Sequence, residues 1–365
     1  MTLSTGVAVE VFTLANPYRV ILDMPDVSFE LPKTSGQSGK GLISAYRYGL
    51  FAARKARVVI DTVLPVSIDR AVMTPESGGA VKLQLSLVAI DAGKFGAGTG
   101  ASRTSKRPTL SARKAAESPP GKYENGRDRR RPVVVIDPGH GGVDPGTLGP
   151  SNVYEKDVVL AVAKELLEEL NKLDRFDVAM TRTEDVFVSL DDRLEFSSTR
   201  TADLFLSLHA DAIADKRYVA QTRGATVYTL SDRASDEAAR RMAEKENSAD
   251  AIAGLASFTD EAEGGVRDIL IDLVKRETAN FSMALSNSLV GRLKESARLS
   301  SKPQRSAAFK VLRQTGTPSV LVELGYLSNK EDEKRLTSPD WRRKVAKSIA
   351  AAVGIYFDRR TALAR

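Results

Sequence analysis

The chain has 365 residues, enough for two domains of unequal size, and its 42% hydrophobic and 28% charged residues are ordinary for a folded protein. It contains no cysteine, which excludes disulfides, thiolate metal ligands and a thiol nucleophile. The net charge of +7 is typical of some nucleic-acid-binding proteins, but residues 92–131 alone carry eleven basic and three acidic side chains. The rest of the chain is therefore close to neutral, and we expect no nucleic-acid partner.

Residues 1–91 have the pattern of a small all-β sandwich. Short apolar or alternating segments are separated by turn signals such as Asn16-Pro17, and no helical period runs through them. A weak internal repeat relates Arg-Val-Ile-Leu-Asp at 19–23 to Arg-Val-Val-Ile-Asp at 57–61. Strands are expected at 7–12, 18–23, 43–48 and 81–90.

The basic segment 92–131 separates this region from the rest of the chain. It is rich in Gly, Ser, Pro, Lys and Arg and poor in large apolar residues, so it cannot bury enough surface to offset the entropy of ordering. We expect a disordered linker. No apolar stretch approaches the ~20 residues that cross a bilayer, and we expect no transmembrane segment.

From Pro132 onward, short apolar runs alternate with helical patterns, which predicts an α/β domain with a mixed, largely parallel sheet flanked by helices. The expected strands are 133–136, 178–181, 204–208, 225–230 and 320–323. The expected helices include a segment whose apolar stripe runs from Val158 to Leu170, together with 234–250, 266–294 and 340–357.

The only two histidines follow two of these strands. His140 comes after the run that begins at Val133, and His209 closes the run that begins at Leu204. Sites in α/β sheets form beyond the carboxyl ends of strands, so both side chains are expected at one edge. Either one alone would fit a structural role, but both together predict a zinc site that needs one more ligand and an open position.

Two acidic residues are candidates to complete this site. Glu155 begins the helix after a glycine-rich loop, where it would also suit the helix dipole. Glu323 follows four residues of buried strand, and an unpaired charge there would be costly. Beside a metal-activated water it would serve as a general base.

Four segments in chain order resemble the zinc-dependent N-acetylmuramoyl-L-alanine amidases, the cell-separation amidases of bacteria. The resemblance covers residues 132–358 and implies a catalytic domain of that family. The four segments are Asp-Pro-Gly-His-Gly-Gly at 137–142, Glu-Lys at 155–156, Ser-Leu-His-Ala-Asp at 207–211 and Val-Glu-Leu-Gly-Tyr-Leu-Ser-Asn at 322–329.

The resemblance implies that His140, Glu155 and His209 bind one zinc ion and that Glu323 is the catalytic base. The implied substrate is peptidoglycan, cut at the amide between N-acetylmuramic acid and the L-alanine of the stem peptide. Zinc would polarise the carbonyl and activate water, and Glu323 would pass the water's proton to the leaving amine. Two alternatives stay open: a zinc peptidase or deacetylase of the cell wall, and an inactive wall-binding scaffold.

Relatives that need activation carry an insertion whose helix covers the site, and residues 232–282 correspond to it. Glu-Lys-Glu-Asn at 244–247 resembles their inhibitory segment, which implies that Glu246 occupies the open zinc position. The charged pattern alone would favour an ordinary exposed helix. The apolar residues that follow would form the docking surface for an activator, for which the resemblance implies a LytM-type protein: Val266, Ile269, Leu270, Leu273 and Val274.

The N-terminal region resembles the AMIN domain, a β-sandwich that binds peptidoglycan and directs such amidases to the division septum. The similarity rests on Phe-Thr-Leu-Ala-Asn-Pro-Tyr-Arg-Val at 12–20 with Asp23. It implies a periplasmic monomer at the septum, although no export signal precedes the first strand, so we expect a start further upstream or a truncated chain.

Overall fold

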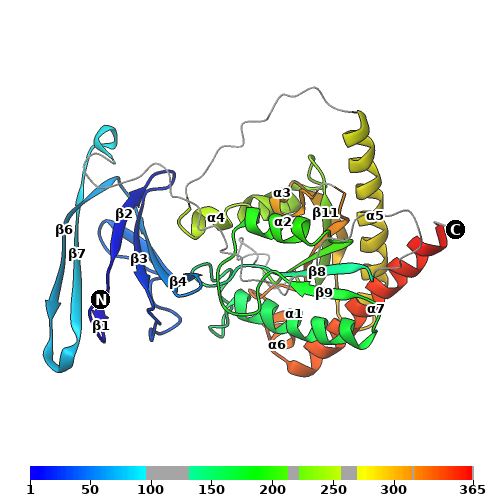
Figure 1. Ribbon diagram of the computed structural model, residues 1–365, viewed down its shortest axis with the longest axis horizontal. Coiled ribbons are helices and arrows are strands. Elements are labelled where there is room, and N and C mark those ends of the chain that lie inside the picture. Colours follow the sequence, from blue (N-terminus) through cyan, green and yellow to red (C-terminus); the bar gives the residue numbers. More distant parts are fainter. Residues whose placement is uncertain (96–130, 213–221, 256–268, 315, 364–365) are drawn as a thin grey trace.

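The computed structural model describes residues 1–95, 131–212, 222–255, 269–314 and 316–363 (Figure 1). The predicted linker at 92–131 lies almost wholly outside these residues. A β-sandwich formed by the first 95 residues packs beside a three-layer α/β domain, as Figure 1 shows. The all-β and α/β fold classes predicted from the sequence are therefore confirmed.

The N-terminal sandwich consists of a four-stranded and a three-stranded antiparallel sheet. Its core lies between the sheets and includes Val20, Leu22 and Val58. The first sheet has the order β2-β3-β5-β4, with β2 Glu10–Leu14, β3 Arg19–Pro25, β5 Lys55–Thr62 and β4 Ile43–Ala52. The second has the order β1-β7-β6, with β1 Thr2–Leu3, β7 Val81–Ala89 and β6 Val66–Pro75, and short 3-10 turns at Ser77–Gly79 and Ala92–Lys94.

The internal repeat seen in the sequence forms two neighbouring strands. In the antiparallel pair β3 and β5, Arg19 lies opposite Asp61 and Asp23 lies opposite Arg57. Successive strand residues point to opposite faces, so these charged residues share the face opposite the sandwich core. That face is turned towards the α/β domain.

The sheet of the α/β domain has the order β12-β11-β13-β10-β8-β9, and every neighbouring pair except β11 and β13 is parallel. The polar edge strand β12, which contains Pro303, was not predicted; a half-exposed edge lacks a long apolar run. The strands are β8 Val133–Pro138, β9 Asp177–Met180, β10 Leu204–His209, β11 Ala225–Leu230, β12 Leu299–Ala307 and β13 Ser319–Glu323.

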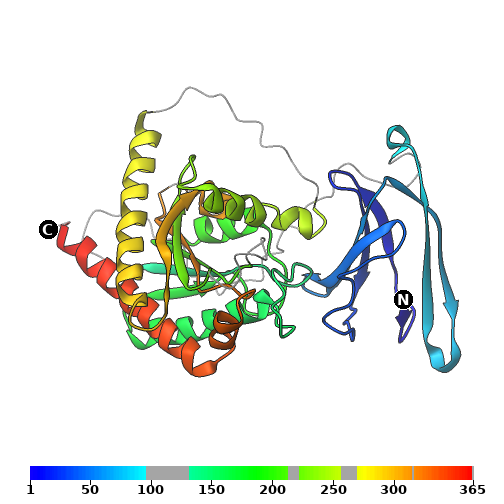
Figure 2. The same cartoon turned by 180° about the vertical axis from the view of Figure 1, so that it is seen from behind.

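Helices cover both faces of this sheet (Figure 2). The predicted helix at 234–250 is interrupted at Asn247 and Ser248, which separate α3 from α4. One face packs against α1 Glu155–Lys172, α5 Ile269–Leu293 and α7 Pro339–Leu363. The remaining helices are α2 Leu190–Thr199 and α3 Glu237–Glu246 on the other face, the short α4 Ala249–Ile252 and α6 Lys330–Leu336, and a 3-10 turn at Lys310–Leu312.

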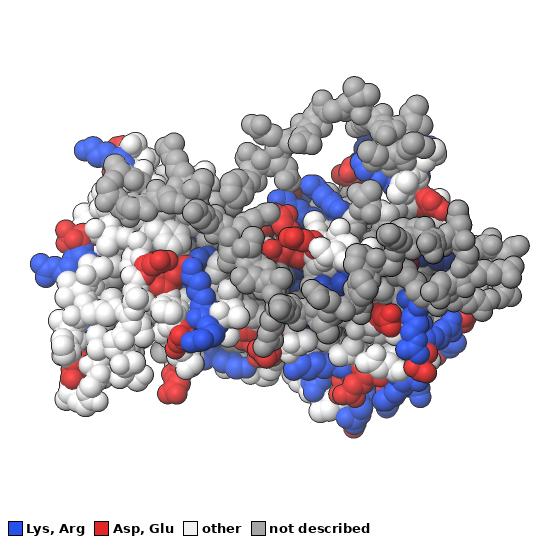
Figure 3. Space-filling view, in the orientation of Figure 1, with Lys and Arg blue, Asp and Glu red and all other residues white. Residues whose placement is uncertain are grey.

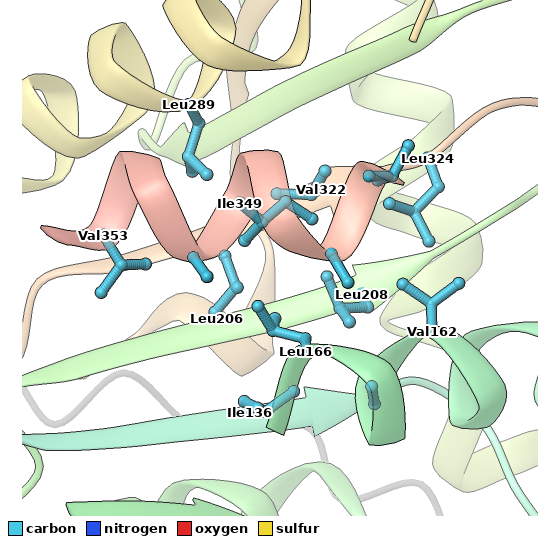
Figure 4. Close-up of a cluster of buried hydrophobic side chains, with 14 of the residues drawn as sticks. Ile136, Val162, Leu166, Leu206, Leu208, Leu289, Val322, Leu324, Ile349 and Val353 are labelled. Atoms are coloured by element: carbon cyan, nitrogen blue, oxygen red, sulfur yellow. The ribbon is translucent and has the colours of Figure 1, made fainter. Parts of the chain in front are cut away.

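The main core lies between the sheet and α1, α5 and α7 (Figure 4). Leu206 and Leu208 of β10 project into it beside Leu166 of α1 and Ile349 of α7. The alternate residue Phe205 faces the opposite layer, which contains α3. Because β10 is buried on both faces, its end and the side chains there are fixed by packing.

The surface visible in Figure 3 carries interspersed acidic and basic side chains over the α/β domain, whereas the sandwich shows wide uncharged areas. Among the described residues, no helix is both long enough and apolar enough to cross a membrane.

Truncation of Leu206 should test the role of this core. Leu206 is fully buried, so Leu206→Ala removes apolar contacts and leaves a cavity, and we expect a loss of about 2–5 kcal/mol in the free energy of unfolding. Denaturant unfolding of both proteins measures it. The control Leu273→Ala removes the same atoms from an exposed position on α5 and should change stability by less than about 0.5 kcal/mol. Equal losses in the two variants would contradict this assignment of the core.

Candidate metal centre

Three strands bring the candidate residues to one edge of the sheet. β10 ends at His209 and β13 ends at Glu323, and these two residues lie opposite each other in the parallel register. His140 follows β8 by two residues, and its ring centroid lies 5.0 Å from that of His209. The expected convergence of the two histidines at one sheet edge is present.

Glu155 and Glu246 each approach both imidazoles. Glu155 Oε1 lies 3.1 Å from His140 Nε2 and 3.4 Å from His209 Nδ1. Glu246 Oε2 lies 3.5 Å and 3.1 Å from the same two nitrogens. All four side chains are buried. The two carboxylates come from different layers, since Glu155 begins α1 and Glu246 ends α3.

These atoms fit a tetrahedral metal ion. His140 Nε2 and His209 Nδ1 are buried and have no hydrogen-bond partner, and His140, His209 and Glu246 present ligand atoms within 4.8 Å of one another. Zinc bonds of 2.0–2.2 Å in tetrahedral geometry separate neighbouring ligand atoms by about 3.3–3.6 Å. The four nitrogen–oxygen distances of 3.1–3.5 Å are close to that range. Two imidazoles with carboxylates are a donor set that zinc accepts.

The glycine-rich loop after β8 allows this close arrangement. A Cβ atom at Gly139 would lie 2.3 Å from the His209 ring, and one at Gly146 would lie 2.7 Å from the His140 ring and 2.8 Å from Glu155. His140 itself has a φ of 59°, a left-handed conformation that costs a non-glycine residue about 1 kcal/mol or more. The surrounding contacts must therefore hold His140 in place.

Buried polar groups provide those contacts. Asp144 Oδ2 lies 2.9 Å from His140 Nδ1, which leaves Nε2 to face the other ligands. Arg193 donates to the His140 carbonyl at 2.8 Å and pairs with Asp137 at 2.5 Å. Glu155 is also fixed, because its two oxygens accept from the Thr147 and Ala210 amides, each at 2.9 Å. Such outer contacts orient metal ligands and set their tautomers.

The charges of the cluster shift the pKa values of its members. Burial lowers the pKa of His209, but Glu246 and Glu155 outweigh it and raise it to about 9. Burial also opposes ionisation of Glu155, yet His140 and His209 hold its pKa well below the usual range. These opposite shifts show that the carboxylates of the cluster favour a positive charge at the position of the imidazoles.

Glu323 lies deeper at the same edge. It is fully buried; Oε2 accepts from the Asp211 amide at 3.0 Å, and Oε1 has no partner. Burial raises the pKa of Glu323 to about 8, His209 opposes the shift, and the charges of Glu155 and Glu246 add to it. A carboxyl group near neutrality with one free oxygen has the properties of a proton-transfer residue.

The end of α3 closes the site. The side chain of Glu246 is 5% exposed, and the cavity that it lines together with His140, His209, Leu190 and Val311 has a volume of only about 10 Å³. Lys245 pairs with Asp211 and donates to Thr147 at 3.0 Å. Asn247 donates to the Ala308 carbonyl and accepts from the Lys310 amide. Three consecutive side chains therefore anchor this helix end beside the histidines.

Several of these residues are not predicted from the sequence. Asp144 lies within the glycine-rich loop and belongs to no regular element, and Lys245 stands in the sequence only as part of the Glu-Lys-Glu-Asn segment. Asp137 and Arg193 were not singled out, because a buried ion pair between a strand and a helix gives no local pattern. The only available signal was Asp137 itself, a charged residue directly after four apolar strand residues.

Comparison with known proteins identifies the family. The model of the family described as N-acetylmuramoyl-L-alanine amidase matches residues 134–354, and that of the AMIN domain matches residues 1–81. The amidase AmiC of Escherichia coli O6:H1 is 32% identical over 372 aligned positions that cover 97% of this chain and 85% of that protein. The chain belongs to the N-acetylmuramoyl-L-alanine amidase family.

Other relatives agree with this assignment. AmiC of Neisseria meningitidis is 33% identical over 357 positions, which cover 95% of this chain and 83% of that protein. AmiA of Escherichia coli K12 is 37% identical over 226 positions, 62% of this chain and 76% of that protein. The predicted family and the function of a peptidoglycan amidase are thus confirmed. The AMIN domain and the AmiC relatives indicate an enzyme of the periplasm and cell wall.

The contact between Asp144 and His140 leads to a test. We expect Asp144→Asn to weaken zinc binding about 10- to 100-fold, because the neutral amide holds the imidazole less strongly and lowers its basicity. Competition with a chromophoric chelator measures the dissociation constant. Asp177→Asn, at an exposed position on β9, is the control and should bind zinc like the original protein. Unchanged affinity in a folded Asp144→Asn variant would show that this carboxylate does not support the ligand.

Proposed function

We propose that this chain is a zinc-dependent amidase in which His140, Glu155 and His209 hold one zinc ion and Glu323 is the general base. The proposed substrate bond is the amide between N-acetylmuramic acid and the L-alanine of the stem peptide. The observation that carries the metal assignment is the pair of buried imidazole nitrogens without a partner, each within 3.5 Å of two carboxylates. The family match supports the substrate.

When bound, zinc would supply a Lewis acid that polarises the scissile carbonyl and activates water. The protein's own residues do the remaining work. Glu155 contributes a negative charge that offsets the metal, and its hydrogen bonds to Thr147 and Ala210 prevent it from turning away. Asp144 keeps His140 in the tautomer whose Nε2 is free to coordinate.

Glu323 is suited to move the proton. Its Oε2 is fixed by the Asp211 amide, whereas Oε1 is free, so one oxygen positions the group and the other is available to the reaction. The free oxygen can take a proton from the attacking water and return it to the leaving nitrogen.

We also propose that the described state is inhibited. Substrate needs access to the ion, yet Glu246 lies as close to the two histidines as Glu155 does and leaves room for at most about one water molecule. Glu246 would therefore be a fourth ligand that has to leave. Lys245 and Asn247 hold it through contacts on both sides, so activation requires movement of the whole end of α3.

The proposed docking surface for an activator follows in the chain. Leu273 and Val274 are exposed apolar residues on α5, 55% and 40% accessible, and exposed apolar side chains at neighbouring positions suit a protein partner. Val266 lies outside the described residues, and so do the side chains of Ile269 and Leu270. We propose that a LytM-type activator binds here and that the enzyme acts at the division septum, to which the AMIN domain directs it.

Replacement of the proposed base should abolish hydrolysis without loss of metal. We expect Glu323→Gln to lower the release of stem peptides from purified sacculi at least about 100-fold, since the amide cannot accept the proton. Mass spectrometry of the products and zinc analysis of the protein measure both properties. Glu195→Gln, on the exposed side of α2, is the matched control. Full activity of Glu323→Gln would reject the proton-transfer role, and cleavage within the stem peptide would reject the amidase assignment.

Removal of the proposed inhibitory ligand should activate the enzyme. We expect Glu246→Ala to raise basal hydrolysis of sacculi about ten-fold or more, because one ligand position becomes free for water and substrate. Glu244→Ala, on the exposed side of the same helix, is the control and should leave basal activity unchanged. A folded, zinc-loaded Glu246→Ala protein with no more activity than the original would contradict the inhibited state.

A further inference from the structure

The N-terminal sandwich contacts the segment that follows Glu246. Arginines from three strands, Arg19 of β3, Arg47 of β4 and Arg57 of β5, donate hydrogen bonds to consecutive carbonyls at the end of α4 and just beyond it. Arg19 donates to Ala251 and to Leu255 at 3.3 Å, Arg47 donates to Ile252 at 2.7 Å, and Arg57 donates to Ala253 and Gly254 at 3.1 Å each.

The carbonyl of Ala251 also accepts from the Gly254 amide at 3.0 Å, whereas the carbonyls that follow it lie at or past the end of α4. The last carbonyls of a helix lack the next turn that would donate to them, and α4 has only four residues. Guanidinium groups donate through several N–H groups in a fixed plane, and bonds from a charged donor are stronger than neutral ones. The three arginines therefore supply charged donors to the carbonyls at the end of α4 and just beyond it.

Packing of apolar groups completes the contact. Ala253 and Leu255 join a cluster with Ile21 and Val59 on the outer face of the sandwich. A Cβ atom at Gly254, whose φ is 74°, would lie 2.6 Å from the Ile21 side chain. The backbone of this segment thus lies directly on the sheet, and only glycine fits at this position.

A second contact joins the sandwich to the loop that carries His140. The carbonyl of Leu50 in β4 accepts from the Val143 amide at 3.3 Å and from the Phe187 amide at 3.2 Å. The rings of Phe51 and Phe187 stack with centroids 5.8 Å apart. One face of the sandwich therefore contacts both residues 251–255 and the loop after β8 that carries His140.

Contacts within the sandwich orient these arginines towards residues 251–255. Arg57 is paired with Asp23 at 2.6 Å and Arg47 with Asp61 at 2.7 Å, so each guanidinium is oriented from its own sheet. Arg19 is completely buried and donates to four backbone carbonyls, those of Ala15 and Pro17 in its own domain and those of Ala251 and Leu255. Burial lowers the pKa of Arg19 to about 10, and Arg47 adds to the shift. Part of the hydrogen bonding of this buried cation therefore comes from residues 251–255.

We propose that the N-terminal sandwich is part of the inhibitory device: its three arginines hold residues 251–255 and thereby stabilise Glu246 at the metal centre. This inference rests on the proposed inhibition by Glu246. Only a few residues separate Glu246 from the held carbonyls, and α4 is further fixed because Asp250 accepts from the Leu190 amide at 3.0 Å. A displacement of residues 251–255 is therefore transmitted to the end of α3. Separation of the sandwich from this segment shifts the equilibrium towards the open state.

The experiment uses the full-length, zinc-loaded protein. Arg47→Ala removes the hydrogen bond to Ile252 while Asp61, at the rim of the contact, keeps access to water. We expect amide hydrogen exchange in residues 247–255, followed by mass spectrometry, to accelerate about ten-fold, and basal hydrolysis of sacculi to rise by a similar factor. The control is Arg54→Ala on the same domain, where the arginine pairs only with exposed Asp26.

A second variant approaches the contact from the other side. Gly254→Val leaves the sandwich unchanged but places a side chain where Ile21 lies, and it should produce the same two effects. Unchanged exchange and activity in both variants, with Glu246→Ala activated, would overturn this inference and leave the proposed inhibition intact. No activation in Glu246→Ala would instead refute the inhibition and with it the role given to the sandwich. Faster exchange in Arg54→Ala as well would overturn the assignment to these arginines.

Discussion

The burial of two imidazoles and two carboxylates in one small space is the constraint on which the rest of this structure depends. Charged groups are costly to bury unless each is paired, and His140 Nε2 and His209 Nδ1 have no hydrogen-bond partner. The surrounding strands, loop and polar contacts hold the residues of this cluster in position. Packed strands fix His209, a glycine-rich loop lets the rings approach closely, and buried polar contacts hold His140 in its left-handed conformation. A metal ion would satisfy both nitrogens at once.

Much of the fold and of this cluster could be predicted from the sequence, because parallel strands end at a common edge. The register that sets His209 opposite Glu323 follows from two apolar runs of similar length, and the chain offers only two histidines. The polar edge strand β12 could not be predicted in this way. Nor could Asp144 be assigned to His140, since that contact depends on how the loop folds and not on spacing along a regular element.

Glu246 shows a different limit of sequence reasoning. Its helix has the charged pattern of an exposed element, and only the family resemblance pointed to a ligand. The burial of Glu246 arises at the end of α3, where Ala243 and Met242 pack on the sheet and the helix stops at Asn247. The sequence predicted a longer continuous helix, and such a helix would not have ended beside the histidines. The position of a helix end, which local patterns define poorly, therefore decides whether the glutamate is exposed to solvent or buried beside the histidines.

The role of the arginine–aspartate repeat becomes clear only when the two strands that contain it are paired in the sheet. In the sequence it was only a weak similarity between two segments. In the antiparallel pair each arginine lies opposite the other strand's aspartate; Asp23 pairs with Arg57 across the two strands, and Asp61 pairs with Arg47 of the next strand, so the sheet itself orients two of the three guanidinium groups. The remaining donors can then bind a second element without leaving an uncompensated charge. No reading of either segment alone would reveal that this face contacts residues 251–255.

The proposed closed state would be held by several separate contacts along one short stretch of chain. Glu246 lies at the histidines, Lys245 pairs with Asp211, Asn247 bonds to the Ala308 carbonyl and the Lys310 amide just after β12, and the sandwich arginines bind the carbonyls at and beyond the end of α4. Neighbouring contacts on one element do not act independently, because the release of one allows the backbone shift that weakens the next. Each contact can contribute only a small stabilisation, and together they would still favour the closed state until the contacts at one end of the stretch are broken. If Glu246 inhibits the enzyme as proposed, such an arrangement would give it a low resting activity and would let separate events at either end of the stretch contribute to its release.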